Sequence, residues 1–313
     1  MTLKQLRYLI AITEAGSFSA AARRAYIAQP ALSRQIGLLE DELEVQLLER
    51  QRDGINLTDA GRRLYEIARS VIQTVDSVKD ELESTKGNPK GHVAIAIPVT
   101  ASALLLPLII TRASKKFPSI ELTVRDGLSQ EGGEAIELGK VDFGVVPNAE
   151  ELEHVHADPV FIEELYWLGQ LTEPNDRNTI TLAKAAASTL VMAPRSASHL
   201  RRRAEQAAMQ TGVELNVVYE QQTAQGLSSL VRCGLAATIC NWPAVEEGTQ
   251  QSALRIVEPS LQRTIAIAHS THKPLSFAAS CMRDLVRSIL VETVQSGRWK
   301  GELIEQPRPQ EDA

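Results

Sequence analysis

The residues most suited to chemistry in this sequence lie between Ser17 and Leu48, where they could read DNA. This stretch predicts a short helix, a tight turn and a longer helix that begins near Pro30, since the missing N–H of proline costs nothing in a first turn. One face of the longer helix is apolar and consists of Leu32, Ile36, Leu39 and Leu43. The opposite face carries Pro30, Ser33, Arg34 and Gly37. A short, positively charged face on the second helix of such a pair fits the major groove of DNA.

The C-terminal half of the longer helix limits how much of it could enter a groove. This half is crowded with the acidic residues Glu40, Asp41, Glu42 and Glu44. DNA phosphates repel carboxylates, so we expect only the first turns of the helix to lie deep in the groove. The predicted DNA-reading face is therefore Gln29–Arg34.

A small hairpin after this helix pair adds two arginines. Asp53-Gly54 is a hairpin turn signal, and Arg50 and Arg52 lie beside it. Three helices and a basic hairpin make a winged helix-turn-helix, in which these arginines would contact phosphate or the minor groove. In the alternative, the hairpin is only solvated and its arginines pair with Glu49 or Asp53.

The second part of the chain carries no recognisable catalytic set. It contains no G-x-S-x-G, H-E-x-x-H or P-loop motif and no clear G-x-G-x-x-G. What remains is a group of hydroxyl residues where predicted strands lead into helices, namely Thr100, Ser102, Ser196 and Ser198. Exposed N–H groups and the helix dipole make such turns suitable for an anion such as a carboxylate, although each residue alone could be a simple helix cap. Other predicted strand-end turns contain Ser129, Pro147, Asn148 and Thr223.

Histidines and cysteines are weaker candidates. His154 and His156 could form half of a metal site, but they lie in an acidic stretch where plain solvent exposure is the competing interpretation. Cys233 and Cys240 have apolar neighbours and are expected to be inert core thiols, with a redox pair as the alternative. We therefore expect no metal and no cofactor.

Composition narrows the class of protein. The 313 residues carry a net charge of −6, so any DNA contact must come from a local patch. Their length is enough for about two domains. The three cysteines lack a C-x-x-C pair, which argues against a disulfide framework or zinc site and fits a reducing cytoplasm. Neither a signal peptide nor an apolar run long enough to span a bilayer is expected.

A long helix is predicted from Thr58, as its cap, to about Lys86. Its apolar residues alternate at spacings of four and three, as in a heptad seam, and are Leu64, Ala68, Val71, Val75, Val78 and Leu82. Such a narrow stripe usually packs against a copy of itself, which would supply the two-fold symmetry of paired DNA half-sites. The alternative is an ordinary helix packed on its own domain.

Beyond the turn-forming residues 87–91, strands alternate with helices. Strands are predicted at 93–98, 120–125, 141–146, 161–169, 189–193, 214–220, 236–241 and 263–268. The helices between them are predicted to end near 116, 138, 187, 210, 232 and 295. This alternation predicts a mainly parallel sheet with helices on both faces. Two similar halves predict a hinged two-lobe binding domain, with its ligand between the lobes at the carboxyl ends of strands.

Residues from Met1 to about Lys90 resemble the DNA-binding region of LysR-type transcriptional regulators. The residues that carry this resemblance are Leu6-Arg7-Tyr8, Gly16-Ser17-Phe18, Ala20-Ala21-Ala22, Gln29-Pro30-Ala31-Leu32-Ser33, Ile36, Leu39-Glu40, Leu43, Leu47-Leu48, Arg50, Leu57-Thr58 and Gly61. The rest of the chain is similar in layout to the family's effector-binding domain, and it most resembles the branch that contains regulators of nitrogen assimilation. The turn at 98–102 and Pro147 lie where related proteins vary, which leaves the effector's identity open.

The resemblance implies an α+β protein in three parts. These are a winged helix-turn-helix domain at 1–58, a linker and dimerisation helix at 59–87 and, after a hinge at 88–91, a two-lobe α/β effector domain of the type 2 periplasmic-binding-protein class at 92–300. Lobe I would contain about 92–162 and 267–300, and lobe II about 163–266. Residues 301–313 would form a tail.

The family's site residues transfer to this chain position by position. Its DNA-contacting positions correspond to Gln29, Pro30, Ser33, Arg34, Arg50 and Arg52. Its effector cleft would be lined here by Thr100, Ser102, Ser129, Asn148, Ser196 and Thr223.

The sequence therefore predicts a cytoplasmic bacterial transcription regulator, not an enzyme, that is controlled by a small anionic effector bound between the lobes. The expected partners are double-stranded DNA with an interrupted palindrome, the effector and further copies of the chain in a dimer of dimers. RNA polymerase is a candidate partner, and no membrane partner is expected. A solute-binding or transport module is one alternative, and an enzyme of small-acid metabolism with a regulatory head is another. The helix-turn-helix pattern counts against the first, and the missing catalytic set counts against the second.

Overall fold

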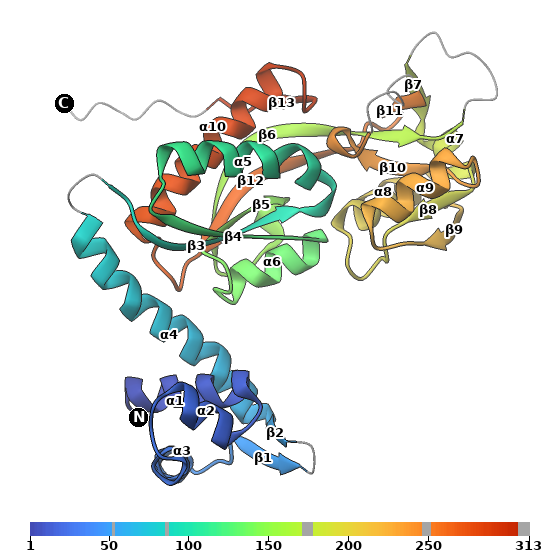
Figure 1. Cartoon of the computed structure of the whole chain (residues 1–313). Coiled ribbons are helices and arrows are strands. Elements are labelled where there is room, and N and C mark those ends of the chain that lie inside the picture. The colour runs from blue at the N-terminus through green and yellow to red at the C-terminus, as the bar shows by residue number, and fades with distance from the viewer. Residues whose placement is uncertain (52–53, 85–87, 171–177, 246–251, 306–313) are drawn as a thin grey trace. The chain divides into compact units, whose positions relative to one another are not determined.

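The computed structural model describes residues 1–51, 54–84, 88–170, 178–245 and 252–305 (Figure 1). The chain divides into two compact units, Met1–Thr85 and Lys86–Ala313. Each unit has hydrophobic clusters of its own. None of the described helices is both long and apolar enough to cross a membrane.

The first unit begins with the helices α1 (Leu3–Ala15), α2 (Phe18–Arg24) and α3 (Gln29–Leu43). Thr2 and Gln5 form a capping box at the start of α1, and Ser17 Oγ accepts a hydrogen bond from the N–H of Ala20 at the start of α2. These local bonds determine where the two helices begin.

The predicted apolar stripe of α3 is buried except at its end. Leu32, Ile36 and Leu39 are at most 2% exposed and pack into the core of this unit. Leu43 is 36% exposed, because the helix ends there and Glu44 turns the chain with a positive φ of 55°.

A two-stranded wing follows α3. Strand β1 (Leu48–Gln51) pairs antiparallel with β2 (Gly54–Leu57), and the turn residues Arg52 and Asp53 lie outside the described residues. The N–H of Ile55 donates to the carbonyl oxygen of Gly16 at 3.2 Å, which ties the wing to the turn between α1 and α2. The predicted winged helix-turn-helix is confirmed.

Helix α4 (Asp59–Ser84) completes the first unit, and its apolar residues divide into two faces. Ala68 of the predicted seam and Ile72, which the seam did not include, are buried against Leu6 of α1. Ala68 therefore packs on its own domain. The neighbouring face carries Ile67, Val71, Val75 and Val78, which are 36–56% exposed. The side chain of Leu82 lies outside the described residues.

Lobe I of the second unit is built on one sheet with the order β4-β3-β5-β12-β6. Its elements are β3 (Gly91–Pro98), α5 (Ser102–Lys116), β4 (Ile120–Gly127), α6 (Ser129–Glu137), β5 (Phe143–Pro147), β6 (Val155–Leu168), β12 (Gln262–Ser270), α10 (Phe277–Gln295) and β13 (Gly301–Leu303). Alternate residues of β3 face opposite sides: Val93 and Ile95 pack with α5 and α10, and Ala94 packs with α6. Helices thus cover both faces of the sheet, as predicted.

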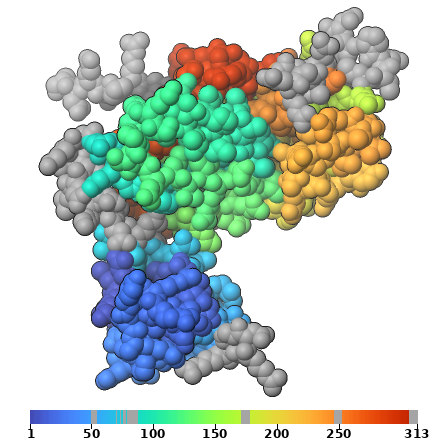
Figure 2. Space-filling view, viewed as in Figure 1, coloured from blue at the N-terminus to red at the C-terminus, as the bar shows by residue number. Residues whose placement is uncertain are grey.

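Lobe II contains the C-terminal end of β6 and a second set of elements. They are β7 (Thr179–Thr181), α7 (Leu182–Ala187), β8 (Leu190–Met192), α8 (His199–Gln210), β9 (Val217–Glu220), α9 (Ala224–Arg232), β10 (Thr238–Asn241) and β11 (Ala253–Val257). Short 3-10 turns occur at η1 (Val99–Ala101), η2 (Ala149–Glu151) and η3 (Trp242–Ala244). The two lobes lie side by side, with most of lobe I in green and most of lobe II in yellow and orange (Figure 2).

Two predictions about the second unit are wrong. The sheet is not mainly parallel: β3 pairs parallel with β4 and β5, but β12 runs antiparallel to β5 and β6. In lobe II, β8 pairs parallel with β9 and β7 with β11, whereas β10 and β11 run antiparallel to β6. The supposed tail from residue 301 begins with β13, which pairs with β6, and residues 306–313 lie outside the described residues.

Gly61 lies in the first turn of α4, where the backbone of Leu47 leaves no room for a side chain. A Cβ at this position would lie 1.9 Å from the carbonyl oxygen of Leu47, a backbone atom that cannot swing away. We expect Gly61→Ala to lower the free energy of unfolding of the first unit by roughly 1–3 kcal/mol, as overpacking does. Scanning calorimetry of the full chain would measure this loss.

Gly37→Ala is the matched control, since a Cβ there would meet no atom within 4 Å. Alanine is a better helix former than glycine by about 1 kcal/mol, so this change should stabilise the unit. Equal effects of the two substitutions would contradict the packing role of Gly61.

Candidate DNA-binding and effector sites

The first turns of α3 present the predicted DNA-reading face to solvent. Gln29, Pro30 and Arg34 are exposed, and Ser33 is half-buried. Ala28 precedes the helix and supplies no side-chain cap, so the N-terminus of α3 keeps donors for a phosphate. The side chain of Gln29 is oriented by a hydrogen bond from Ser19 Oγ to its Oε1 at 3.0 Å.

Charges around this face favour an approach by DNA. Arg34 has no hydrogen-bond or ion-pair partner among the residues that the structure describes, so its guanidinium keeps its donors for an outside acceptor. Two of the nearby acidic residues are used within the unit: Glu40 Oε1 accepts the N–H groups of Leu47 and Leu48 at 2.7 and 3.1 Å, and Glu42 pairs with the amino group of Met1. The acidic half of α3 therefore helps to hold the wing and the N-terminus.

The wing arginines remain predictions. The backbone of Arg50 belongs to β1, but its side chain and all of Arg52 lie outside the part that the structure describes. The structure adds a residue that sequence reasoning missed. Tyr26 is 96% exposed in the turn before α3 and has a positive φ of 53°, and Arg23 and Arg24 end the helix before it. The sequence could have indicated Tyr26 as a DNA-contacting candidate, because it is an aromatic residue close to two arginines in a helix-turn-helix.

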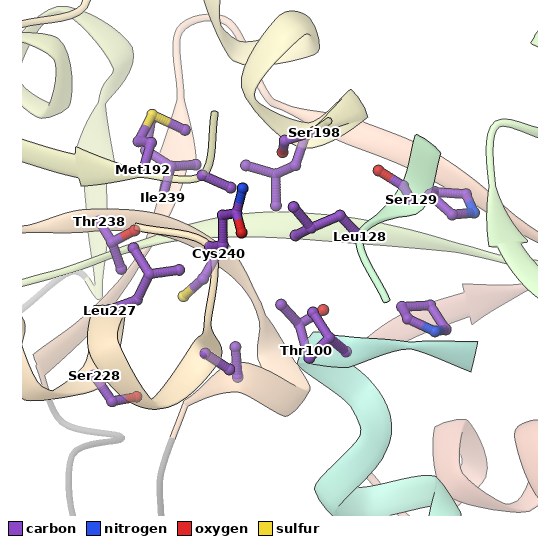
Figure 3. A pocket seen from close by; sticks show the side chains of 18 of the residues that line it. Thr100, Leu128, Ser129, Met192, Ser198, Leu227, Ser228, Thr238, Ile239 and Cys240 are labelled. Atoms are coloured by element: carbon purple, nitrogen blue, oxygen red, sulfur yellow. The ribbon is translucent and has the colours of Figure 1, made fainter. Parts of the chain in front are cut away.

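A cavity of about 80 Å³ lies between the lobes of the second unit (Figure 3). Its lobe I wall contains the carboxyl ends of the parallel strands, at Pro98, Gly127 and Pro147. Its lobe II wall is mostly apolar and includes Leu168, Met192, Leu227, Ile239 and Ala244. This space holds several water molecules or a small ligand, and it lies where the sequence placed the ligand.

The starts of several helices meet at this cavity. The lining includes Thr100 just before α5, Ser129 at the start of α6, Ser198 before α8 and Ala224 at the start of α9. The unpaired N–H groups and the dipole give each helix start a partial positive charge. Together they favour an anionic group in the cavity.

The structure brings only two of the six predicted effector residues to the lining, Thr100 and Ser129. Ser102, Ser196, Asn148 and Thr223 lie outside it. Thr223 Oγ1 caps its own helix by accepting the N–H of Gly226 at 3.1 Å. Asn148 is buried, and its Oδ1 accepts the N–H of Thr264 at 3.2 Å, so it fastens η2 to β12.

Several lining residues come from strands and were missed: Thr238, Cys240 and Arg263. Arg263 forms a buried ion pair with Glu163, whose other oxygen accepts a hydrogen bond from Trp299 Nε1 at 2.6 Å. The sequence did contain a signal for Arg263, because one arginine and one glutamate lie inside otherwise apolar strands. Buried charges are usually paired, so these two residues could have been expected to meet.

The two lobes also hydrogen-bond directly to each other beside the cavity. The N–H of His199 in α8 donates to Ser129 Oγ at 3.0 Å, and Arg202 donates to Gln130 Oε1 at 3.2 Å. The Nδ1 atom of His199 lies 3.0 Å from Arg202 Nη2 and 3.1 Å from Glu151 Oε2.

The presence of a proton on Nδ1 of His199 decides between these two partners. Burial, and after it the charge of Arg202, lowers the pKa of His199 below its usual value, while Glu151 opposes this shift. A ring with its proton on Nε2 alone accepts from Arg202 at Nδ1, whereas a ring with a proton on Nδ1 donates to Glu151 of the other lobe.

The cysteines differ from one another. Cys240 is buried in the cavity wall, and burial, followed by the charge of Glu163, raises its pKa to about 12. Its thiol stays protonated at neutral pH and is a poor nucleophile, as expected for a core thiol. Cys233 is exposed, so the expectation of a core position is wrong there. In the described part of the chain, no three His, Cys, Asp or Glu side chains are arranged to hold one metal ion.

Known proteins match most of the chain. A family model described as "Bacterial regulatory helix-turn-helix protein, lysR family" matches residues 3–62, and one described as "LysR substrate binding domain" matches residues 86–290. The nitrogen assimilation regulatory protein nac of Klebsiella aerogenes is 26% identical over 295 residues, which cover 93% of this chain and 95% of that protein. The DNA-binding transcriptional dual regulator OxyR of Escherichia coli K12 is 26% identical over 292 residues, 92% of this chain and 95% of that protein.

Solved structures share the fold. A full-length OxyR variant from Pseudomonas aeruginosa superposes with a TM-score of 0.73 at 21% identity and covers 98% of this chain and 99% of its own. Full-length CbnR in complex with its target DNA gives a TM-score of 0.66 at 24% identity and covers 92% of this chain and 100% of its own. With both domain models matched in order, the chain belongs to the LysR family of bacterial transcriptional regulators, not to an enzyme family.

Proposed function

We propose that this regulator reads double-stranded DNA with residues 29–34 of α3 and with its wing, and that a small anionic effector in the interlobe cavity controls promoter activity. The observation that carries the effector proposal is the meeting of four helix starts at one mostly apolar cavity. The protein would act in the cytoplasm, where its DNA lies, with RNA polymerase as a further partner.

The cavity favours an effector with one acidic group on a small apolar body. Its positive potential comes from helix starts, because the charge of Arg263 is already balanced by Glu163. The hydroxyls of Thr100 and Thr238 can bond a carboxylate, and the aliphatic walls exclude a large polar ligand. Ser129 and Ser198 contribute less in this arrangement, since their oxygens already accept the N–H groups of His199 and Arg201.

Some relatives bear the name hydrogen peroxide-inducible genes activator. The Cys240 thiol in the cavity wall does not fit the role of a peroxide sensor, because it is buried and its pKa is raised to about 12. Reactive cysteines have lowered pKa values and partial exposure.

The exposed face of α4 supports assembly with a second copy. Its four residues, Ile67, Val71, Val75 and Val78, follow one another at steps of four, four and three. An apolar stripe of this spacing packs into the matching stripe of another helix. We propose a dimer through α4, which dimerises again on an interrupted palindrome.

The DNA-reading role is tested at Arg34. The DNA is a duplex that the unmodified protein has selected from random sequences. We expect Arg34→Ala to weaken binding to this duplex by roughly 1–3 kcal/mol, because a bidentate contact to a base would be lost. Arg112→Ala, which removes the same charge from the second unit, is the control and should bind as before. An unchanged gel shift for Arg34→Ala would exclude the assignment.

The effector proposal is tested by thermal shift. Small carboxylic acids are screened against the full chain together with their neutral amides, and we expect an acid to raise Tm where its amide does not. Thr100→Val keeps the shape but removes a hydroxyl from the lining, so it should weaken the acid's apparent affinity about fivefold, or about 1 kcal/mol. Ser196→Ala, outside the lining, should leave the affinity unchanged, and amides that bind as well as acids would contradict the anion preference.

The dimer proposal is tested by charge insertion. We expect the double substitution Val71→Glu and Val75→Glu to raise the dimer dissociation constant at least tenfold, about 1.4 kcal/mol, because two carboxylates would face their own copies across the interface. Light scattering after gel filtration gives the mass. Arg69→Glu on the opposite side of α4 is the control, and a variant that stays as oligomeric as the unmodified chain would refute this interface.

A further inference from the structure

Four of the chain's six histidines gather at one end of lobe I. His156 at the start of β6 lies directly opposite His269 near the end of β12, and their ring centroids are 5.2 Å apart. His154 and His272 form a second pair with centroids 4.8 Å apart. The sequence singled out His154 and His156 as half of a metal site, and the fold supplies a partner for each from a distant part of the chain.

The spacing of both pairs fits two imidazoles bound to one ion. A nitrogen–metal bond of about 2.1 Å places the metal roughly 3.2 Å from a ring centroid, so two rings at an angle of 90–110° have centroids roughly 4.5–5.2 Å apart. The interplanar angles are 35° for the cross-strand pair and 45° for the other. Small rotations about χ2, which is a soft torsion in histidine, can direct a nitrogen of each ring to a common point.

The pairs are accessible, and charged neighbours do not take their nitrogens. His154, His156 and His272 are exposed, and His269 is half-buried. Arg283 of α10 lies near His269 and pairs with Asp284 at 2.9 Å, and Asp158 of β6, two residues after His156, pairs with Arg287. The ring nitrogens that these contacts leave available are donors suited to zinc, copper and nickel, whereas magnesium and calcium require oxygen ligands.

We propose that these paired histidines bind a divalent transition-metal ion, with His156 and His269 as a two-nitrogen ligand across strands β6 and β12 and His154 and His272 as an adjoining pair. No third protein ligand joins either pair within the described residues, so water completes the coordination. The preferred ion is copper(II), followed by nickel(II) and zinc(II), in the usual order for nitrogen ligands.

Metal bound across β6 and β12 would stabilise the folded second unit. The two histidines of the cross-strand pair are far apart in sequence and meet only when the strands pair. An ion that binds the folded state alone raises its stability by mass action. The same two strands carry Glu163 and Arg263, so the ion would stiffen the ladder that runs to the effector cavity.

The test uses the full chain without an affinity tag. Isothermal titration with nickel(II) should show binding to the unmodified protein, and the double substitution His156→Gln and His269→Gln should lower the affinity at least tenfold. His92→Gln is the matched control, because His92 lies on β3 in the same lobe and hydrogen-bonds Thr123 Oγ1 at 2.8 Å instead of another histidine. Circular dichroism of each variant without metal verifies that the fold is unchanged.

A second measurement separates a folded site from loose surface binding. Nickel(II) should raise Tm in the unmodified protein and in His92→Gln, but not in the double variant. Equal nickel affinity in the double variant and the unmodified protein would overturn the proposal. So would a loss of the same size in His92→Gln, since any exposed histidine would then be an equivalent ligand.

Discussion

The buried ion pair between Glu163 and Arg263 is the interaction on which the effector domain depends. The two residues lie opposite each other on β6 and β12, where these strands pass from one lobe to the other, and their side chains are at most 4% exposed. Trp299, which is fully buried, bonds the second oxygen of Glu163 from the segment before β13. Removing one partner of such a pair costs about 3–5 kcal/mol, because a charge is left buried and unpaired. Movement of one lobe against the other must therefore take place around this crossing without breaking it.

The same pair determines the electrostatics of the cavity. Arg263 contributes to the lining, but Glu163 neutralises its charge. The cavity therefore contains no uncompensated cation among its described lining residues. The attraction for an anion then comes from helix starts, each equivalent to roughly half a charge. Several partial charges around a small space stabilise a single carboxylate, but they do not repay the desolvation of a multiply charged ligand. For the proposed acidic effector, selectivity would then depend on the shape of the apolar wall.

Residue patterns along the chain were enough to predict the helices. The direction of the strands and the residues that reach the cavity depend on strand pairing, which the sequence does not show. Helices α5, α8 and α10 end where they were predicted to end, at Lys116, Gln210 and Gln295, because a proline or glycine follows two residues after each. Strand direction was mispredicted since β12 is buried on both faces and reads alike in either direction. For the site, Thr100 and Ser129 followed from their place at helix starts. Thr223 did not, because a capping side chain turns back onto its own helix, and Thr238 and Arg263 reach the cavity only through strand pairing.

Helix α4 has one face that packs on its own domain and another that is open to a second copy, which the sequence presented as alternatives. One face, with Ala68 and Ile72, packs on α1, and the adjacent face, with Val71 and Val75, is open to a partner. Because both faces belong to one rigid helix, a dimer formed through the open face would fix each recognition helix relative to its two-fold partner. The spacing of adjacent half-sites would then be a property of α4, insensitive to the effector. An effector would then act on the association of two such dimers, because the two-lobe domains are the parts of the chain that remain to form that second interface.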